Sequence, residues 1–596
     1  MNEINIKKIS KRLVDVAMGR EPADLVIRNG RWVCVQSGEI IPNTDIAIVD
    51  KRIAYVGSDA SHTIGSKTNI VDAENDYLVP GLLDAHMHIE SSMVTVTEFV
   101  KAVVPHGTTG IFVDPHEIAN VFGLKGVKLM VDEALNQPIH VWVQMPSCVP
   151  SAPGFETPGA TIGPEEVAEA MTWDGIIGLG EMMNFPGVYM SDDKMHAEMA
   201  ETKAKGKVIG GHYASLDLGL PFHGYVAAGP EDDHEGTRIE DAIARVRQGM
   251  KPMLRYGSAW HDVANQIGAI IEKRLDSRHF ILCTDDSHSE TLVNDGHMDR
   301  VLRHAIKHGL KPITALQMCT INTAEHFGLA KDIGMIAPGR FADVLIVKDL
   351  NNFRAEKVYA KGRLIAENGL MLSELPTYSY PKWATNSINV GKNLTEEDFI
   401  IKTDILGTVT ANVIGVIENQ APTKHLRMKM NAVNGKVSVD IERDIAKIAL
   451  IERHHDTGRV QVGFVHGFRL NRECAIGSTV AHDSHQMIIV GTNEQNMAIA
   501  AHKLIEMQGG QVVILDGKNI GSVPLPIGGL MSCESAEKVA KQATTVLDGF
   551  KRCGCNLNNP NMQLSLLALV VIPELRLSDL GLVDVKNLQF LPVIEQ

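Results

Sequence analysis

The stretch YLVPGLLDAHMH at residues 77–88 decides the fold, because an apolar run leads through Pro80-Gly81 directly into a pair of histidines. Successive side chains of a β-strand point to opposite faces, so His86 and His88 face the same side and can meet at one centre. Two imidazoles in this arrangement suit Zn, Fe or Mn. The alternative interpretation is a pair of polar residues in a turn. The stretch therefore predicts a buried strand that ends in a candidate metal site.

The region around this stretch, residues 78–331, alternates apolar strand-like runs with helical segments. Runs such as TGIFVDPHE and HFILCTDDS are separated by segments such as RIEDAIARVRQG. Alternation of this kind over about 250 residues is typical of a parallel (β/α)8 barrel. A doubly wound open sheet is the alternative, but no G-x-G-x-x-G turn follows the first strand. We expect an α/β protein built on a TIM-like barrel.

Strand-rich segments flank the barrel region. Residues 21–77 contain runs such as DLVIRNGRWVCV and DIAIVDKRIAYVG, which predict a small antiparallel unit. Residues 332–385 return to strand-like sequence and end in a Pro/Tyr-rich linker. We expect them to complete the first unit as a small β-sandwich that the barrel splits. Residues 1–20 predict an amphipathic N-terminal helix, and residues 386–596 predict a separate C-terminal α/β domain.

The composition excludes several classes of function. The 596 residues include 57 Lys and Arg against 72 Asp and Glu, a formal net charge of −15. Nucleic-acid coats and membrane-surface binders need basic faces, so we expect neither a nucleic acid nor a membrane as partner. The eight cysteines are scattered along the chain, which suits a reducing compartment, and the charged N-terminus has no apolar signal core. We expect a cytoplasmic multidomain enzyme.

Metal-ligating side chains recur where later strands of the predicted barrel end. Such positions lie at the carboxyl-terminal mouth, where barrels carry their functional residues. A carboxylate at the end of a buried strand is costly unless a cation pairs with it. Each of these residues could instead be a solvated or hydrogen-bonded structural group. Together they form the candidate metal site: His86, His88, Glu181, His212, His234 and Asp285.

PGLLDAHMH, the single histidines on later strands and the carboxylate on the last strand resemble the amidohydrolase superfamily of metal-dependent hydrolases. The flanking stretches IRNGRWV and IGMIAPGRFADVLIVK are similar to the split β-sandwich of that superfamily. The resemblance implies that His86 and His88 are ligands from the first strand. It likewise implies that His212 and His234 are ligands from strands five and six, and that Asp285 is the ligand and base on strand eight.

Glu181 departs from the hydantoinase, dihydroorotase and urease pattern, in which a carboxylated lysine on the fourth strand bridges two metals. A glutamate can bridge two cations without modification, so a binuclear centre remains feasible. Histidine and carboxylate ligands without thiolate are compatible with Mn, Fe and Zn. The resemblance favours two ions per active site, Mn or Fe, with Zn as the alternative.

One branch of the superfamily, the bacterial-type adenine deaminases, is similar over nearly the whole chain. The stretches that carry this resemblance are HMHIESSM (86–93), GTTGIFVDPHEIANVFG (107–123), PSCVPSAPGFE (146–156), GLGEMMNFPGV (178–188), CTDDSH (283–288), VGFVHGFRL (462–470) and GSTVAHDSHQMIIVG (477–491). The resemblance implies hydrolytic deamination of adenine to hypoxanthine and ammonia, a reaction of purine salvage. It also identifies residues 386–596 as the C-terminal domain of this branch.

Other functions are compatible with parts of the pattern. The first alternative is another binuclear amidohydrolase that acts on a cyclic amide or on a different aminopurine. A phosphoesterase on the same scaffold and a non-catalytic relative are further alternatives. Every expected ligand position holds a usable ligand, which disfavours the non-catalytic relative.

The implied reaction begins with a hydroxide that two cations hold and that attacks C6 of adenine. Asp285 would take the hydroxide proton and pass it to the leaving amine. A further group must protonate or hydrogen-bond N1 of the purine. Glu235 is the first candidate for that group, and Glu90, His116 and Glu117 are the others. For His116 and Glu117 the alternative interpretation is the start of a helix.

The C-terminal domain has a polar loop of its own, AHDSH at residues 481–485. We expect His482, Asp483 and His485 to reach the barrel mouth and to contribute to the substrate pocket or to an additional metal site. Alternatively, the loop packs against the barrel through hydrogen bonds. We further expect a small-molecule substrate and a homodimer or higher homo-oligomer, with the N-terminal helix as a candidate contact.

Overall fold

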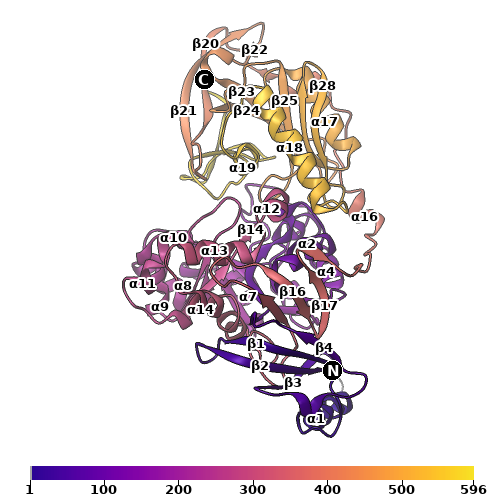
Figure 1. Cartoon of the computed structure of the whole chain (residues 1–596). Coiled ribbons are helices and arrows are strands. Elements are labelled where there is room, and N and C mark those ends of the chain that lie inside the picture. Colours follow the sequence, from indigo (N-terminus) through magenta and orange to yellow (C-terminus); the bar gives the residue numbers. More distant parts are fainter. Residues whose placement is uncertain (1–2, 596) are drawn as a thin grey trace.

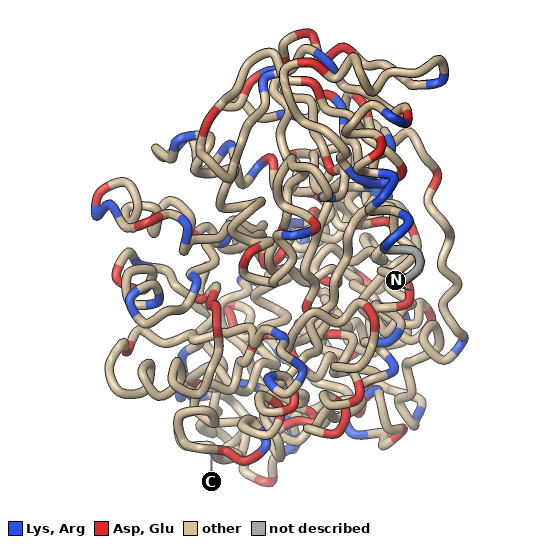
Figure 2. Tube along the Cα trace, turned by 90° about the horizontal axis from the view of Figure 1, so that it is seen from below, with Lys and Arg blue, Asp and Glu red and all other residues tan. Residues whose placement is uncertain are grey.

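The computed structural model describes residues 3–595 and shows an α/β protein whose parts follow one another along the molecule (Figure 1). The N-terminal strands lie at one end, a part rich in helices and parallel strands lies in the middle, and the C-terminal sheet lies at the other end. Acidic and basic residues are intermixed along the chain in Figure 2. Among the described residues, none of the helices is long and apolar enough to cross a membrane.

The middle part contains the region predicted as a barrel. Its strands are apolar and buried on both faces, as in parallel sheets that helices cover; every residue of the run TTGIFV is buried. One parallel sheet has the order β10–β9–β8–β7–β6–β14, and a second has the order β11–β12–β13. The strands are β6 (Leu82–His88), β7 (Thr108–Val113), β8 (His140–Met145), β9 (Ile176–Met182), β10 (Val208–Gly211), β11 (Asp232–Asp233), β12 (Lys251–Arg255), β13 (Ile281–Cys283) and β14 (Asp285–Asp286).

The two parallel sheets adjoin at both edges. The backbone N–H of Glu231, just before β11, donates to the carbonyl of Ile209 in β10 over 2.9 Å. At the other edge β14 follows directly after β13 and pairs with β6, Asp285 opposite Met87. Helices alternate with these strands along the chain: α2 (Val96–Val103), α3 (His116–Phe122), α4 (Leu124–Ala134), α5 (Pro164–Ala170), α7 (Asp193–Ala204), α8 (Leu220–Ala228), α9 (Ile239–Arg247), α12 (Ser289–Asn294), α13 (Met298–Lys307), α14 (Pro312–Met318) and α15 (Ile321–His326).

The N-terminal strands and the strands between residues 344 and 371 form one sheet. Its two halves join where β15 pairs antiparallel with β5, Val344 opposite Pro80. β4 and β5 run parallel to β1, so the prediction of a purely antiparallel unit is wrong. The segment before β4, which includes the 3-10 helix η1 (Ser61–Thr63), returns the chain to the same end of the sheet. The strands are β1 (Leu25–Cys34), β2 (Glu39–Val49), β3 (Arg52–Gly57), β4 (Asn69–Asp72), β5 (Tyr77–Pro80), β15 (Val344–Val347), β16 (Ala355–Ala360), β17 (Arg363–Glu367) and β18 (Leu370–Met371).

The stretch YLVPGLLDAHMH divides at Gly81, since its first half is β5 of the N-terminal sheet and its second half is β6 of the middle part. A Cβ atom at Gly81 would lie 2.0 Å from Thr109 Oγ1, so the chain can pass β7 here only with a glycine. The predicted N-terminal helix is α1 (Glu3–Ala17); residues 1 and 2 of the predicted range lie outside the described residues.

The C-terminal part is a mixed sheet with helices, and it is seated on the middle part. The amide of Gln486 donates to the carbonyl of Thr157 over 2.6 Å, and the backbone N–H of Ser532 donates to the carbonyl of Met93 over 2.9 Å. The elements of the sheet, in order across it, are β19 (Ile401–Lys402), β22 (Lys436–Val437), β21 (Thr423–Val433), β20 (Gly407–Val416), β24 (Val460–His466), β23 (Ile445–Ile451), β26 (Met487–Gly491), β25 (Cys474–Ser478), β27 (Gly510–Leu515) and β28 (Lys518–Pro524). Its helices include α17 (Glu494–Glu506), α18 (Ala536–Arg552) and α19 (Pro560–Leu566).

Candidate metal centre and active site

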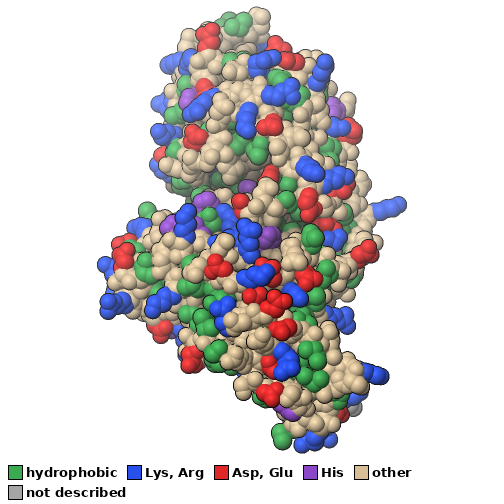
Figure 3. All heavy atoms as spheres, in the orientation of Figure 1, with side chains coloured by type: hydrophobic (Ala, Val, Ile, Leu, Met, Phe, Trp, Pro, Cys, Tyr) green, Lys and Arg blue, Asp and Glu red, His purple; other side chains and the backbone are tan. Residues whose placement is uncertain are grey.

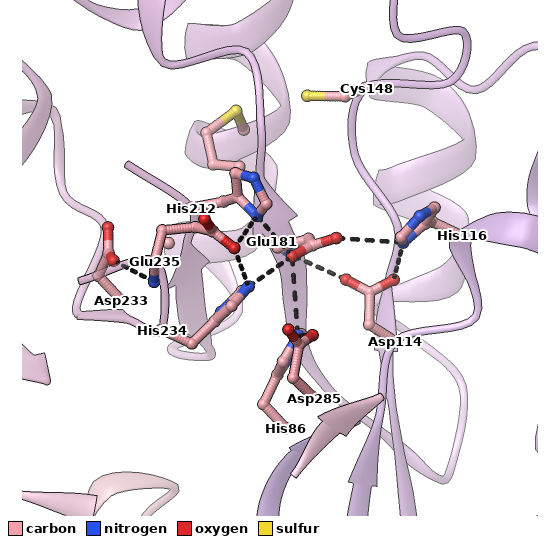
Figure 4. A network of polar contacts seen from close by, with 12 residues as sticks. His86, Asp114, His116, Cys148, Glu181, His212, Asp233, His234, Glu235 and Asp285 are labelled. Carbon is pink, nitrogen blue, oxygen red and sulfur yellow. Dashed lines mark hydrogen bonds and ion pairs between the residues drawn. The ribbon is translucent and has the colours of Figure 1, made fainter. Parts of the chain in front are cut away.

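The six side chains predicted as metal ligands converge at the carboxyl-terminal ends of the parallel strands; all of them except His88 are labelled in Figure 4. β6 supplies two histidines, β9 supplies the glutamate, β14 supplies the aspartate, and the remaining histidines follow β10 and β11. Five of the six are almost fully buried, and the His212 side chain is 22% exposed. The strand-end positions that the sequence singled out therefore meet in one buried cluster.

Glu181 lies at the centre of this cluster. Its Oε2 is 2.8 Å from His212 Nδ1, 2.9 Å from His234 Nε2 and 3.6 Å from His86 Nε2. Its Oε1 is 3.8 Å from His88 Nε2. Oε2 thus faces His86, His212 and His234, and Oε1 faces His88, so the two oxygens of one carboxylate serve different sets of histidines. This is the arrangement that a bridging ligand requires.

Asp285 closes the cluster from the opposite edge. Its Oδ1 lies 3.3 Å from His88 Nε2 and 3.6 Å from His86 Nε2. His86, His234 and Asp285 offer ligand atoms within 4.8 Å of one another, and so do His86, His88 and Glu181. The two groups share His86, and the distances leave room for an ion between the ligand atoms of each group.

Unpaired nitrogen atoms also indicate that these side chains can hold a divalent cation. Nε2 of His86 and Nε2 of His234 are buried, and neither makes a hydrogen bond of acceptable geometry within residues 3–595. Buried polar atoms in native proteins nearly always have a partner. Imidazole nitrogens that face carboxylates without bonding to them are explained by a cation between them, and histidine with carboxylate is a ligand set for Mn, Fe or Zn.

Asp114, which the sequence reasoning missed, orients two of these ligands. Its backbone carbonyl accepts a hydrogen bond from His88 Nδ1 at 2.8 Å, which leaves Nε2 of that ring free to coordinate. Its carboxylate accepts the backbone N–H of Glu181 at 2.7 Å. A Cβ atom at Gly180 would lie 2.2 Å from that carboxylate. The glycine in the strand run GIIGLGE was the available signal for such a close approach.

Both carboxylates at the centre are ionised near neutral pH. Burial opposes the charge of Glu181, but His212, which is hydrogen-bonded to it, and the neighbouring His234 outweigh burial and hold the pKa of Glu181 well below its usual range. Burial likewise opposes ionisation of Asp285, and the nearby rings of His86 and His88 hold its pKa well below the usual range. The cluster therefore presents the charged forms that bind cations.

Arg255 at the end of β12 is a second residue that the sequence reasoning missed. Its guanidinium donates to Asp285 Oδ2 at 3.0 Å and to Asp262 Oδ2 at 2.7 Å, and it also donates to Glu235. Burial opposes its charge, but the carboxylates of Glu235, Asp285 and Asp262 hold the pKa of Arg255 well above its usual value. A lone cation that ends the buried run KPMLR was the available signal.

The residues predicted to protonate or hydrogen-bond N1 of the purine lie in two places, one beside Arg255 and the other beside the cavity. Glu235 is paired with Arg255, whose charge outweighs burial and lowers the pKa of Glu235. Glu90 and Glu117 line a cavity beside the cluster, and burial together with the charge of Glu117 raises the pKa of Glu90 to about 8. His116 begins α3, as the helix-start interpretation has it, and its Nδ1 also lies 3.2 Å from Glu181 Oε1.

The cavity beside the cluster has a volume of about 340 Å³ and lies between the middle part and the C-terminal part. Its lining comes from both: Glu90, Ser91, Met93, Glu117, Ser258, His288, Glu290 and Thr291 from the middle part, and Val480, His482, Gln511, Leu530, Ala543, Leu547, Asn558, Asn559, Asn561, Met562 and Ser565 from the C-terminal part. Figure 3 shows histidine side chains at the notch between these two parts.

In the polar loop at 481–485, one side chain faces the cavity and two are buried where the C-terminal part meets the middle part. His482 lines the cavity. His485 is fully buried, and its Nδ1 accepts the backbone N–H of Ala481 over 3.2 Å. Asp483 is buried near Glu156 of the middle part, and burial together with the charge of Asp483 raises the pKa of Glu156 to about 7. The loop thus reaches the cavity with one side chain and packs with the other two.

Two family models and several curated relatives match this chain. The model of the amidohydrolase family matches residues 77–365, and that of the adenine deaminase C-terminal domain matches residues 420–589. The chain is 60% identical to adenine deaminase 3 of Rhizobium meliloti (strain 1021) over 98% of this chain and 99% of that one. It is 60% identical to an adenine deaminase of Mesorhizobium japonicum over 98% of this chain and 96% of that one. It is 45% identical to an adenine deaminase of Clostridium botulinum over 98% of this chain and 97% of that one.

Proposed function

The chain belongs to the adenine deaminases of the amidohydrolase family, and on this premise we propose that it converts adenine and water to hypoxanthine and ammonia. One observation carries the proposal beyond the family likeness. Glu181 lies between two pairs of histidines in a buried cluster, and Glu117, within 3.9 Å of His88 Nδ1, lines a cavity large enough for a purine. The substrate would thus meet the ligand cluster from a cavity between the middle part and the C-terminal part.

We infer that the two parallel sheets of the middle part together form one (β/α)8 barrel. The hydrogen bond from Glu231 to Ile209 at one edge and the pairing of Asp285 with Met87 at the other support this closure. We also propose the domain division expected from the sequence. Its parts are an N-terminal helix at 1–20, two sandwich halves at 21–77 and 332–385, the barrel at 78–331 and a C-terminal domain at 386–596.

The ligand cluster would hold two divalent cations, Mn or Fe, with Zn as the alternative. We assign the first-strand histidines, Glu181, His212, His234 and Asp285 as ligands, with Glu181 between the two ions. Such a centre lowers the pKa of water and so supplies a nucleophile near neutral pH. The protein's own contribution is to fix these ligands, and Asp114 does so for His88 and Glu181 through the bonds described above.

Asp285 is the proposed base. Its Oδ2 is held by Arg255 at 3.0 Å, so its Oδ1 is the oxygen that faces the histidines of β6. This oxygen would take the proton of the attacking water and deliver it to the departing amino group at C6. General acid–base catalysis of this kind contributes about 10²–10⁴-fold.

Negative charge builds up on the purine ring during the attack, so a protein group must protonate N1 or donate a hydrogen bond to it. We propose that Glu90, with Glu117 beside it, serves there instead of our first candidate Glu235. Glu90 lines the cavity, whereas the Glu235 carboxylate is engaged by Arg255. His482 would face the substrate from the C-terminal side, and His116, Asp483 and His485 would support the walls of the site.

We also propose that the chain forms a homodimer or a higher homo-oligomer. Val14 on α1 and Met18 directly after this helix are exposed apolar residues. Apolar side chains at the surface are candidates for a contact between copies. Light scattering after size-exclusion chromatography measures the mass, and a monomer at all concentrations contradicts this part of the proposal.

The ultraviolet spectrum of adenine tests the function. Purified protein supplied with Mn²⁺ or Fe²⁺ is expected to convert adenine to hypoxanthine, with ammonia released in equal amount. Adenosine, guanine, hydantoin and dihydroorotate are tested in parallel. Turnover of a cyclic amide in place of adenine favours the alternative amidohydrolase, and no turnover of any of these compounds refutes the proposal.

A further inference from the structure

Gln511 is a polar residue in a buried strand of the C-terminal sheet, and its side chain lines the cavity. All of β27, sequence GQVVIL, is buried, and the residues that follow Gln511 in it are apolar. Its backbone pairs with Ser478 on one side and Val523 on the other, so the sheet does not need the amide. Gln511 Oε1 is buried and has no hydrogen-bond partner among the described residues.

An unpaired buried amide lowers stability, because it loses its bonds to water and gains none in return. Other polar groups on the same wall have neighbours: Asn558 donates to Asn419 Oδ1 at 3.1 Å, and His482 has Asp483 near its Nδ1 at 3.7 Å. Ser565 Oγ on this wall is likewise buried without a partner among the described residues. Of these two unpaired groups, Gln511 is the one that carries a donor and an acceptor on separate atoms, side by side.

We propose that Gln511 recognises the edge of the purine that carries N3 and N9–H, and that it makes the enzyme select the free base over N9-substituted purines. The inference rests on the proposed function, in which C6 of adenine faces Glu181 and Asp285. The N3/N9 edge lies across the ring system from C6, so it points away from the ligand cluster and toward the C-terminal wall.

The chemistry of the two groups matches. N3 of adenine accepts a hydrogen bond, and the adjacent N9–H donates one. A carboxamide offers an N–H donor and an oxygen acceptor side by side, and it pairs in this two-bond manner with base edges that alternate donor and acceptor. A nucleoside or a 9-alkyl purine has carbon on N9, so it lacks the donor and leaves Gln511 Oε1 unpaired. A buried acceptor without a partner is what produces discrimination.

The test compares adenine with 9-methyladenine in the wild type and in Gln511→Met, which keeps the length of the side chain and removes the amide. We expect the KM for adenine to rise about 5- to 50-fold in the variant, with kcat changed much less. The KM for 9-methyladenine is expected to rise less, because that ligand keeps the N3 acceptor but makes no N9–H bond to lose. The preference of the wild type for adenine therefore shrinks in the variant.

Gln542→Met is the matched control. Gln542 lies on α18, and its Oε1 is also buried without a hydrogen-bond partner in the described part of the chain, but it does not line the cavity. This variant should keep the wild-type KM for both purines. If Gln511→Met and Gln542→Met behave alike, or if Gln511→Met raises both KM values equally, the inference is wrong.

A binding measurement separates this inference from the proposed function. Calorimetry with hypoxanthine and 9-methylhypoxanthine needs no turnover, and Gln511→Met should weaken the binding of hypoxanthine more than that of 9-methylhypoxanthine. If Gln511→Met does not melt cooperatively, Gln511→Asn, which withdraws the amide by one methylene, takes its place with the same expectation. A wild type that leaves adenine unchanged refutes the proposed function. A wild type that deaminates adenine while the variant binds hypoxanthine equally well refutes the role of Gln511 alone.

Discussion

Glu198 on α7 makes the stability of the middle part depend on pH. Its side chain is fully buried, and Lys194 Nζ lies 3.2 Å from its Oε1. Neither carboxylate oxygen has a hydrogen bond to another residue within 3–595. Burial raises the pKa of Glu198 from its ordinary 4.5 to about 7, against the opposing effect of Lys194. The native state therefore holds a proton that the unfolded chain has released, over the range between these two values.

The sign follows from this difference in bound protons. Below the unfolded pKa both states are protonated, and as the pH rises from there through the native pKa the native state loses stability relative to the unfolded chain. Between about pH 5.5 and pH 8 the loss is about 2 kcal/mol, since one pKa unit corresponds to about 1.4 kcal/mol. Glu198→Gln removes the titration, so its free energy of unfolding relative to the wild type should rise by about 1–2 kcal/mol over this range.

Urea unfolding of the two proteins at the two pH values, with the same metal content, measures this difference. Comparing variant with wild type at each pH cancels the titration of all other groups. Glu201→Gln on the same helix is the control, because Glu201 is partly exposed, and its difference from the wild type should not change with pH. Parallel pH curves for wild type and Glu198→Gln would refute the reasoning.

Three further predictions concern the ligand cluster. Asp285→Asn should keep its bound metal, measured by elemental analysis, and lose about 10²–10⁴-fold in kcat; near-normal turnover means that the base is another residue. Glu181→Ala should bind fewer ions per chain than the wild type, and an unchanged ion content excludes a bridging role. Arg255→Met leaves Glu235, Asp262 and Asp285 without their shared cation, so unfolding by urea should become easier by about 3–5 kcal/mol and kcat should fall. Arg255→Lys should recover part of both losses, and a fully stable, fully active Arg255→Met contradicts the pairing.

The candidate ligands could be predicted because their signals are local. The i, i+2 spacing of His86 and His88 fixes a common face on any strand, and the ends of parallel strands in a barrel meet at one mouth. Glu181 and Asp285 end apolar runs, where a charge needs a partner. The same local view joined YLVP to GLLDAHMH as a single strand, since nothing in the run itself says that its two halves pair with different sheets.

By itself the sequence determined an α/β protein in the amidohydrolase pattern, the side chains at the strand ends and their likeness to adenine deaminases. Periodicity, strand-end chemistry and motif likeness are properties of neighbouring residues, and they survive without a structure. Only the tertiary structure decided which residues far apart along the chain share a partner. It placed Arg255 against Glu235 and Asp285, set Asp114 beside Gly180, and put the unpaired amide oxygen of Gln511 at the wall of the cavity that Glu117 also lines. The physical reason is that the energy of a buried charge or amide depends on what surrounds it, and those surroundings come from the packing of the whole chain.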